Sequence, residues 1–187
     1  MTLFAEHTYS RVMVFIDLRN IYESCRNFAG SDKIRMDLFR LTNILVGSRD
    51  LVGAYVFDAT IKGVAADEDT KRLHDSLSEN GFRLMNRESM VKRDGDYVQK
   101  EVDVSLACEM LEHALLNHFD IAIVVSGDRD FVPAMQKVQA AGKRVEVAAF
   151  ENVYSSECKK VADVYYMLND VPFLSMSSPI DGGAGYE

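Results

Sequence analysis

Short apolar runs alternate along the chain with stretches in which apolar residues recur at helical spacing. The runs at 12–16 and 121–125 contain no polar residue, which is typical of strands buried on both faces of a parallel sheet. Further strands are predicted at 51–57, 82–85, 145–150 and 164–168, and helices at 36–46, 65–79, 101–116, 131–141 and 155–161. Strands that alternate with helices predict an α/β sandwich around a mainly parallel central sheet.

The chain of 187 residues suits one domain, which is predicted over residues 11–174 after an N-terminal extension of residues 1–10. Residues 175–187 are rich in Ser, Gly and Pro and are predicted to form a flexible tail. No apolar run approaches the ~18 residues that a membrane span needs, and the N-terminus lacks the pattern of a secretory signal. We therefore expect a cytoplasmic protein that does not contact membranes.

Cysteine spacing and net charge narrow the classes of function. Cys25, Cys108 and Cys158 form no CxxC pair, so neither a zinc site nor a disulfide framework is indicated. The chain carries 21 basic and 29 acidic residues, a net charge of −8, which disfavours a general polyanion binder. Nucleic acid would then have to bind through a local basic rim or through metal ions.

Acidic residues follow the two most strongly apolar strands. Asp17 ends the first, with Asn20 three residues later, and Ser126, Asp128 and Asp130 follow the strand at 121–125. Ligands of open parallel sheets bind at the carboxyl ends of the strands, so these groups meet in one pocket if the two strands are neighbours. The structural alternatives are that Asp17 caps the next turn and that Asp130 is a helix N-cap.

Asp103 opens an apolar stripe on the helix predicted at 101–116, a stripe that includes Leu106 and Met110. A buried lone carboxylate is costly unless it is paired or coordinates a cation. An ion pair with Lys100 is the structural alternative. Glu109 lies about 120° from this stripe, so it would reach the rim of a site at most.

Carboxylates that converge in one pocket repel each other and stay ionised only with cations nearby or with raised pKa values. An oxygen-rich ligand set suits Mg²⁺ or Mn²⁺, and such sites serve phosphoryl transfer or phosphodiester cleavage. No nucleotide-binding glycine motif is present. The histidines are predicted to lie on the surface, so no catalytic triad is indicated; they are His7, His74, His113 and His118.

A loose basic cluster flanks Asp103 in the sequence and is a candidate for a phosphate-contacting rim, with a solvated surface as the alternative. It consists of Arg87, Lys92, Arg93 and Lys100. Tyr97 in the same stretch could stack on a base. Arg129, which lies between two aspartates, is a further predicted substrate contact.

Three ordered motifs stand at suitable spacing. They are Phe15-Ile16-Asp17 with Asn20, then Lys100-x-Val102-Asp103-Val104, then Ser126-Gly127-Asp128-x-Asp130-Phe131 followed by Gly142-Lys143-x-Val145. Together they resemble the NYN domain, the LabA-like branch of the PIN-like nuclease superfamily. The resemblance implies a three-layer α/β/α Rossmann-like (PIN-like) sandwich with an acidic pocket that binds a divalent metal and, in active members, hydrolyses RNA. The sequence departs from the family pattern at Leu18, Glu109 and Arg129.

By this resemblance the chain is expected to be a ribonuclease that depends on Mg²⁺ or Mn²⁺, with RNA as its substrate. The catalytic and metal-binding residues would be Asp17, Asp103, Asp128 and Asp130, and the substrate-binding residues would be Asn20, Ser126, Lys100, Arg129, Lys92 and Arg93. The alternative is a non-catalytic RNA-binding or regulatory module that retains the pocket, and a homodimer or regulatory protein partners are compatible with either function. A small-molecule phosphatase is disfavoured, because the first strand ends Asp17-Leu18-Arg19 without a second aspartate.

Overall fold

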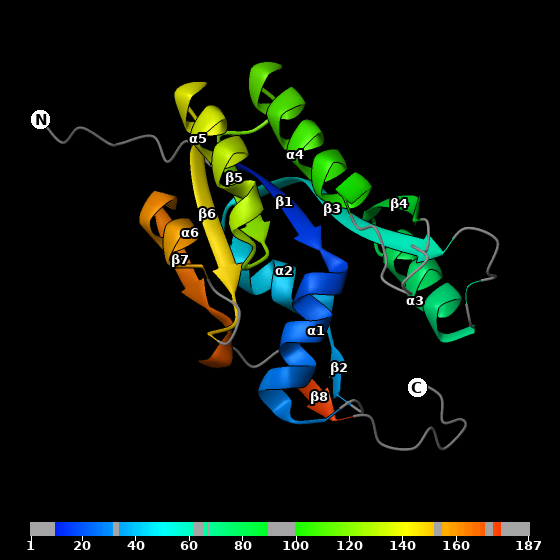
Figure 1. Cartoon of the computed structure of the whole chain (residues 1–187). Helices are drawn as coiled ribbons and strands as arrows, with labels where there is room; N and C mark the ends of the chain where they lie inside the picture. Colours follow the sequence, from blue (N-terminus) through cyan, green and yellow to red (C-terminus); the bar gives the residue numbers. More distant parts are fainter. Residues whose placement is uncertain are drawn as a thin grey trace, which may run out of the picture.

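The computed structural model describes residues 10–31, 34–61, 66, 68–89, 100–151, 155–170 and 174–176. A six-stranded parallel sheet in the order β4-β3-β1-β5-β6-β7 forms its centre (Figure 1). The strands are β1 (Arg11–Asp17), β3 (Asp50–Ile61), β4 (Arg83–Ser89), β5 (Ile121–Val125), β6 (Arg144–Ala149) and β7 (Val164–Met167).

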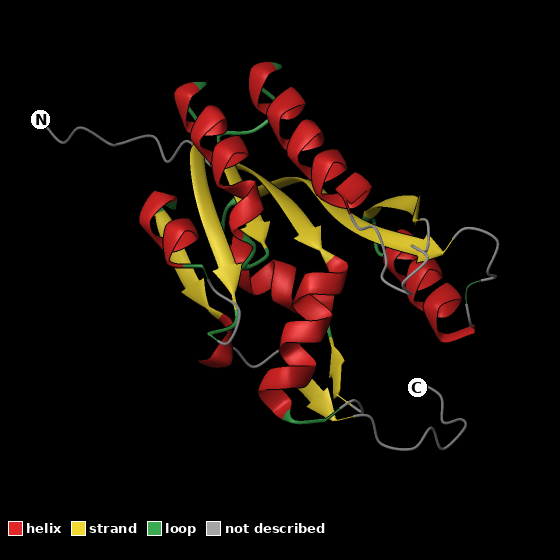
Figure 2. Cartoon of the chain, viewed as in Figure 1, coloured by secondary structure: helices red, strands yellow, loops and turns green. Residues whose placement is uncertain are grey.

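Helices cover both faces of this sheet (Figure 2). They are α1 (Leu18–Ala29), α2 (Leu38–Val46), α3 (Glu68–Glu79), α4 (Lys100–Leu115), α5 (Val132–Ala140) and α6 (Ser156–Val161), with 3-10 turns η1 (Arg129–Phe131) and η2 (Leu168–Asp170). Side chains of α1, α2 and α3 pack into the core on one face, and those of α4, α5 and α6 pack into the core on the other. This arrangement confirms the three-layer α/β/α sandwich.

The alternation of side chains along β1 explains why its apolar run is continuous. Val14 and Ile16 belong to the core beneath α1 and α2, whereas Met13 and Phe15 belong to the core beneath α4 and α5. Successive side chains of a strand point to opposite faces, and both faces are covered here. Each position therefore requires an apolar residue.

Among the described residues, one helix and two short strands are not predicted by the hydrophobic pattern. α1 begins directly after Asp17, where the polar residues Arg19 and Asn20 obscure its apolar face. β2 (Ile34–Met36) and β8 (Leu174–Met176) pair in an antiparallel manner far apart in the sequence, and three residues are too few to show a period. The predicted domain boundary after residue 174 falls inside β8, and residues 1–9 and 177–187 lie outside the described residues.

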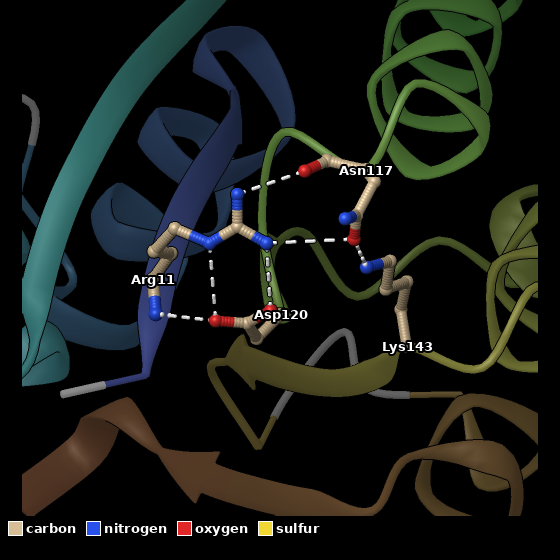
Figure 3. Close-up of polar contacts among 4 residues, drawn as sticks. All are labelled: Arg11, Asn117, Asp120 and Lys143. Carbon is tan, nitrogen blue, oxygen red and sulfur yellow. Dashed lines mark hydrogen bonds and ion pairs between the residues drawn. The ribbon is translucent and has the colours of Figure 1, made fainter. Parts of the chain in front are cut away.

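A polar network ties the start of β1 to the turn that leads into β5 (Figure 3). The Arg11 guanidinium donates to Asp120 Oδ1 at 2.9 Å and to the Asn117 carbonyl at 2.8 Å, and the Asp120 Oδ2 accepts from the Arg11 backbone N–H at 2.9 Å. Lys143, just before β6, donates to the Asn117 side chain. The network holds β1 beside β5, so the opposite, carboxyl ends of the two strands also lie side by side.

In the part of the chain that the structure describes, no helix has the length and apolar character needed to cross a bilayer.

Candidate acidic site

The sheet reverses its strand order at β1 and β5, which is where ligands of open α/β sheets bind. Ile16 of β1 pairs with Val125 of β5, so Asp17 and Ser126 follow the last paired residues on adjacent strands. The two strands are therefore neighbours, as the predicted pocket requires.

Asp17 is fixed at this position by two hydrogen bonds. It is the N-cap of α1, and its Oδ1 accepts from the Asn20 backbone N–H at 3.1 Å. Its Oδ2 accepts from the Ser126 hydroxyl at 3.4 Å. Only 1% of Asp17 is exposed. The capping role given as the structural alternative is therefore real, and it is combined with a position at the centre of the acidic site.

The loop after β5 is held by a series of further hydrogen bonds. Asn20 Oδ1 accepts from the Gly127 N–H at 3.2 Å, and the Ser126 hydroxyl accepts from the Asp128 N–H at 3.2 Å. Asp128 Oδ1 accepts from the Asp130 N–H at 2.9 Å, so Asp128 is the N-cap of η1. The structural alternative that Asp130 is a helix N-cap is wrong, because Asp128 caps η1 and Phe131 occupies the N-cap position of α5, while Asp130 is exposed within η1.

Asp103 reaches the same region from the first turn of α4. α4 contacts β1 and β3 and shares its core with Phe15. Asp17 lies two residues after Phe15 and so points to the same face of the sheet. Asp103 is half-buried, and its charge contributes to the raised pKa of Asp17 at the carboxyl end of β1.

The pKa values show that the predicted carboxylates influence one another. Burial raises the pKa of Asp17 to about 7, and the charges of Asp103 and Asp128 raise it as well. Burial also raises the pKa of Asp103 to about 6, with further contributions from Asp128 and Asp130. Three distant parts of the chain thus place four carboxyl groups close enough to repel each other, and protons or cations relieve that repulsion.

The donor chemistry of this site fits a hard divalent cation, although the side chains are not preassembled as a ligand cage. Among the residues that the structure describes, no three His, Cys, Asp or Glu side chains are arranged to hold a metal ion. Mg²⁺ usually keeps several waters and is bound by one or two carboxylates together with substrate oxygens.

The structure describes only some of the predicted basic residues. Lys92, Arg93 and Tyr97 fall within 90–99, outside the described residues, and Lys100 is described only as the first residue of α4. Arg129 is exposed, and its charge helps to lower the pKa of Glu157, which the Ser155 hydroxyl lowers most. Arg87 donates to the Ser105 hydroxyl at 3.2 and 3.3 Å, so its guanidinium lies near the first turns of α4.

Two histidines predicted to be surface residues are largely buried, so that prediction is wrong for them. His74 Nε2 lies 2.7 Å from Asp58 Oδ2 across α3 and β3, with 13% of its side chain exposed. His113 Nε2 lies 2.7 Å from the Tyr55 hydroxyl. Their partners are 16 and 58 residues away, which a local pattern cannot reveal. His118 is exposed, as predicted, and His7 lies outside the described residues.

Cys158 is a contact of the site that the sequence did not indicate. Its thiol is buried on α6 and donates to the Asp128 carbonyl at 3.2 Å. Burial raises the pKa of this thiol, so it packs as a neutral group beneath the loop that carries Asp128. No sequence signal links an isolated cysteine to a loop 30 residues earlier.

Comparisons with known proteins identify the family of the chain and agree with its fold. The chain is 24% identical over 171 residues to the low amplitude and bright protein LabA of Synechococcus elongatus, covering 87% of this chain and 86% of LabA. A crystal structure of a protein of unknown function from Vibrio parahaemolyticus has the same fold, with a TM-score of 0.74, 24% identity, and coverage of 89% of this chain and 97% of that one. The family model of the NYN domain matches residues 11–169, so this chain belongs to the NYN domain family.

Proposed function

We propose that this protein is a divalent-metal-dependent nuclease that hydrolyses RNA phosphodiester bonds in the acidic site of Asp17, Asp103, Asp128 and Asp130. The observation that carries the proposal is that these carboxyl groups gather in a buried place: burial most of all, and then the charges of the neighbouring aspartates, raise the pKa of Asp17 to about 7 and that of Asp103 to about 6. Membership of the NYN family supports a nuclease-type or RNA-related domain.

The roles follow from how each residue is held. Asp17, Asp103 and Asp128 would bind Mg²⁺ or Mn²⁺, which when bound neutralises charge on the scissile phosphate and activates water. Asn20 fixes the loop after β5 through Gly127, and Ser126 joins Asp17 to the Asp128 backbone. These contacts fix Asp17 and Asp128 relative to each other, as two residues that would hold one cation need to be.

The basic residues would act on the substrate rather than on the cation. Lys92, Arg93, Lys100 and Arg129 are proposed to contact the phosphates that flank the cleaved bond. This assignment places positive charge only at the rim, which accounts for how an acidic protein could bind a polyanion.

The test is cleavage of a labelled single-stranded RNA in Mn²⁺, in Mg²⁺ and in EDTA. We expect cleavage only with a divalent cation, and a loss on the order of 100-fold or more in Asp128→Asn and Asp103→Asn. Asp37→Asn is the matched control, because Asp37 is also a helix N-cap, of α2, but is exposed and lies outside the site. Undiminished cleavage by Asp128→Asn would refute the assignment.

Binding of Mn²⁺, measured by calorimetry on the same variants, separates the two functions considered. Saturable Mn²⁺ binding that Asp103→Asn and Asp128→Asn abolish, without any RNA cleavage, would favour the non-catalytic RNA-binding or regulatory module. Cleavage that disappears in parallel with Mn²⁺ binding would favour the nuclease.

A further inference from the structure

Arg87 is a basic residue near the acidic site to which the proposed function assigns no role. It lies on β4, an edge strand of the sheet that β3 separates from β1. Asp17 pairs with Phe57 of β3, and Phe57 pairs with Met85 of β4, so Met85 stands level with Asp17. Arg87 is two residues further along β4, and it therefore lies at the same end of the sheet as the acidic site.

Arg87 and Asp17 also point to the same face of the sheet. Phe15 and Met85 contact the core on the α4 face, and successive side chains of a strand point to opposite faces. Asp17 and Arg87 each follow one of these residues by two positions, so both side chains point to the α4 side. With strands about 4.8 Å apart and a rise of about 3.3 Å per residue, their backbones are roughly 12 Å apart. One RNA strand can therefore contact both residues, but at different phosphates.

Ser105 of α4 orients the guanidinium of Arg87 without neutralising it. Nε and Nη2 of Arg87 donate to the Ser105 hydroxyl oxygen at 3.3 and 3.2 Å. Ser105 is buried whereas Arg87 is exposed, so the serine is a fixed anchor for the arginine. These bonds occupy one edge of the planar guanidinium, and no described residue accepts from Nη1. The edge formed by Nη1 and Nη2 can therefore make a bidentate contact with a phosphate.

The charge of Arg87 is not balanced in the way that the charges of two structural arginines are. Arg11 forms an ion pair with Asp120 at 2.9 Å. Arg49 forms an ion pair with Glu146 at 2.8 Å. Among the described side chains, no carboxylate forms an ion pair with Arg87, whose printed partner is a neutral hydroxyl. An arginine held in this way keeps its full charge for an anion, and its planar fork matches the geometry of a phosphate.

We propose that Arg87 binds a backbone phosphate of the RNA that flanks the cleaved bond. This inference rests on the proposed function, because the acidic site would hold the scissile phosphate. The substrate then runs from the ends of β1 and β5 across the ends of β3 and β4, and Arg87 fixes its position along that path. A dinucleotide has a single phosphodiester and cannot occupy both places. The substrate class is therefore an RNA strand of more than two nucleotides.

The test is fluorescence anisotropy of a labelled eight-nucleotide oligouridylate with the full-length chain in Ca²⁺, a hard cation that takes oxygen ligands. Arg87→Met should weaken binding about 10-fold. It should also lower the slope of log K against log salt by about 0.7, the value for one phosphate contact on a single strand. The dinucleotide UpU, measured by competition, should bind the variant and the wild type equally.

Two further variants separate this contact from general effects of charge and folding. Arg72→Met is the matched control, because Arg72 is an exposed arginine on α3, which packs on the opposite face of the sheet. It should bind the oligouridylate as the wild type does. Arg87→Lys keeps the charge and loses the fork, so it should restore the salt slope but only part of the affinity.

The outcomes distinguish this inference from the nuclease activity. Equal Kd values of Arg87→Met and the wild type for the eight-nucleotide strand would overturn it, as would equal losses in Arg87→Met and Arg72→Met. A parallel loss of UpU binding would also overturn it, because Arg87 would then contact the phosphate in the acidic site. Cleavage in Mn²⁺ is measured separately. RNA that binds through Arg87 but is not cleaved would refute the nuclease and leave the phosphate contact in place.

Discussion

Asp17 should make the stability of the metal-free protein fall as the pH rises through the weakly acidic range. Its pKa is about 7 in the folded protein, against an ordinary value of 3.8. Between these values the unfolded chain has released the proton and the folded protein still holds it, so each step up in pH favours the unfolded chain. At about 1.4 kcal/mol for each pH unit between the two pKa values, the loss amounts to about 4 kcal/mol by pH 7.

Asp17→Asn tests this reasoning, because asparagine keeps the size of the side chain and the oxygen that accepts from the Asn20 N–H. In EDTA at pH 8, the variant should be more stable than the wild type by up to about 4 kcal/mol, and at pH 4 the two should differ by less than about 1 kcal/mol. The measurement is urea denaturation at intervals between pH 4 and 8. Asp37→Asn, at an exposed N-cap, should follow the wild-type curve throughout.

Metal addition provides the second half of the experiment. Mn²⁺ at 100 times its Kd should stabilise the wild type by about 2.7 kcal/mol at pH 8, and Asp17→Asn should gain less because one of the proposed ligands has lost its charge. If the wild type and Asp17→Asn kept the same difference in stability from pH 4 to 8 in EDTA, then Asp17 would ionise normally in the folded state. The electrostatic account of the site would then be wrong.

Three other substitutions test contacts around and away from the site. The Arg11 hydrogen bonds lower the pKa of Asp120, so this pair stabilises the fold above pH ~4 and the contribution is lost as the pH falls below it. Arg11→Met should remove that acid sensitivity in thermal denaturation between pH 3 and 7. An unchanged profile would contradict the role of the pair. Asn20→Ala frees the loop after β5 and should reduce Mn²⁺ affinity about 10-fold or more in calorimetry. Its free energy of unfolding should fall by about 1 kcal/mol in urea denaturation. A loss of stability alone would assign Asn20 a purely structural role. His74→Ala removes the side-chain partner of Asp58 and should lower the free energy of unfolding by about 1–3 kcal/mol in urea denaturation. Mn²⁺ binding should stay at the wild-type level. A weakened Mn²⁺ affinity would connect this pair to the acidic site.

The sequence predicts those parts of the fold in which the surroundings of a position allow only one type of residue. β1 and β5 lie between two helical layers, so every position is apolar and the strands are visible as continuous runs. The pattern does not reveal α1, because the polar side chains of Asp17 and Asn20, which suggest a site, also form the cap and first turn of that helix. The strand order that brings Asp17 beside Ser126 is a property of the whole sheet, and no local pattern encodes it.

The double role of the aspartates determines which substitutions can identify their chemistry. Asp17 caps α1 and Asp128 caps η1, so replacement by alanine would remove both a carboxylate and a cap. Loss of a cap alone costs about 1 kcal/mol, and a shifted loop would displace the other carboxylates. Asparagine preserves the capping oxygen and removes only the charge. A large loss of cleavage in Asp128→Asn with unchanged stability therefore assigns the effect to the charge, whereas a loss that appears only in Asp128→Ala assigns it to the position of the loop.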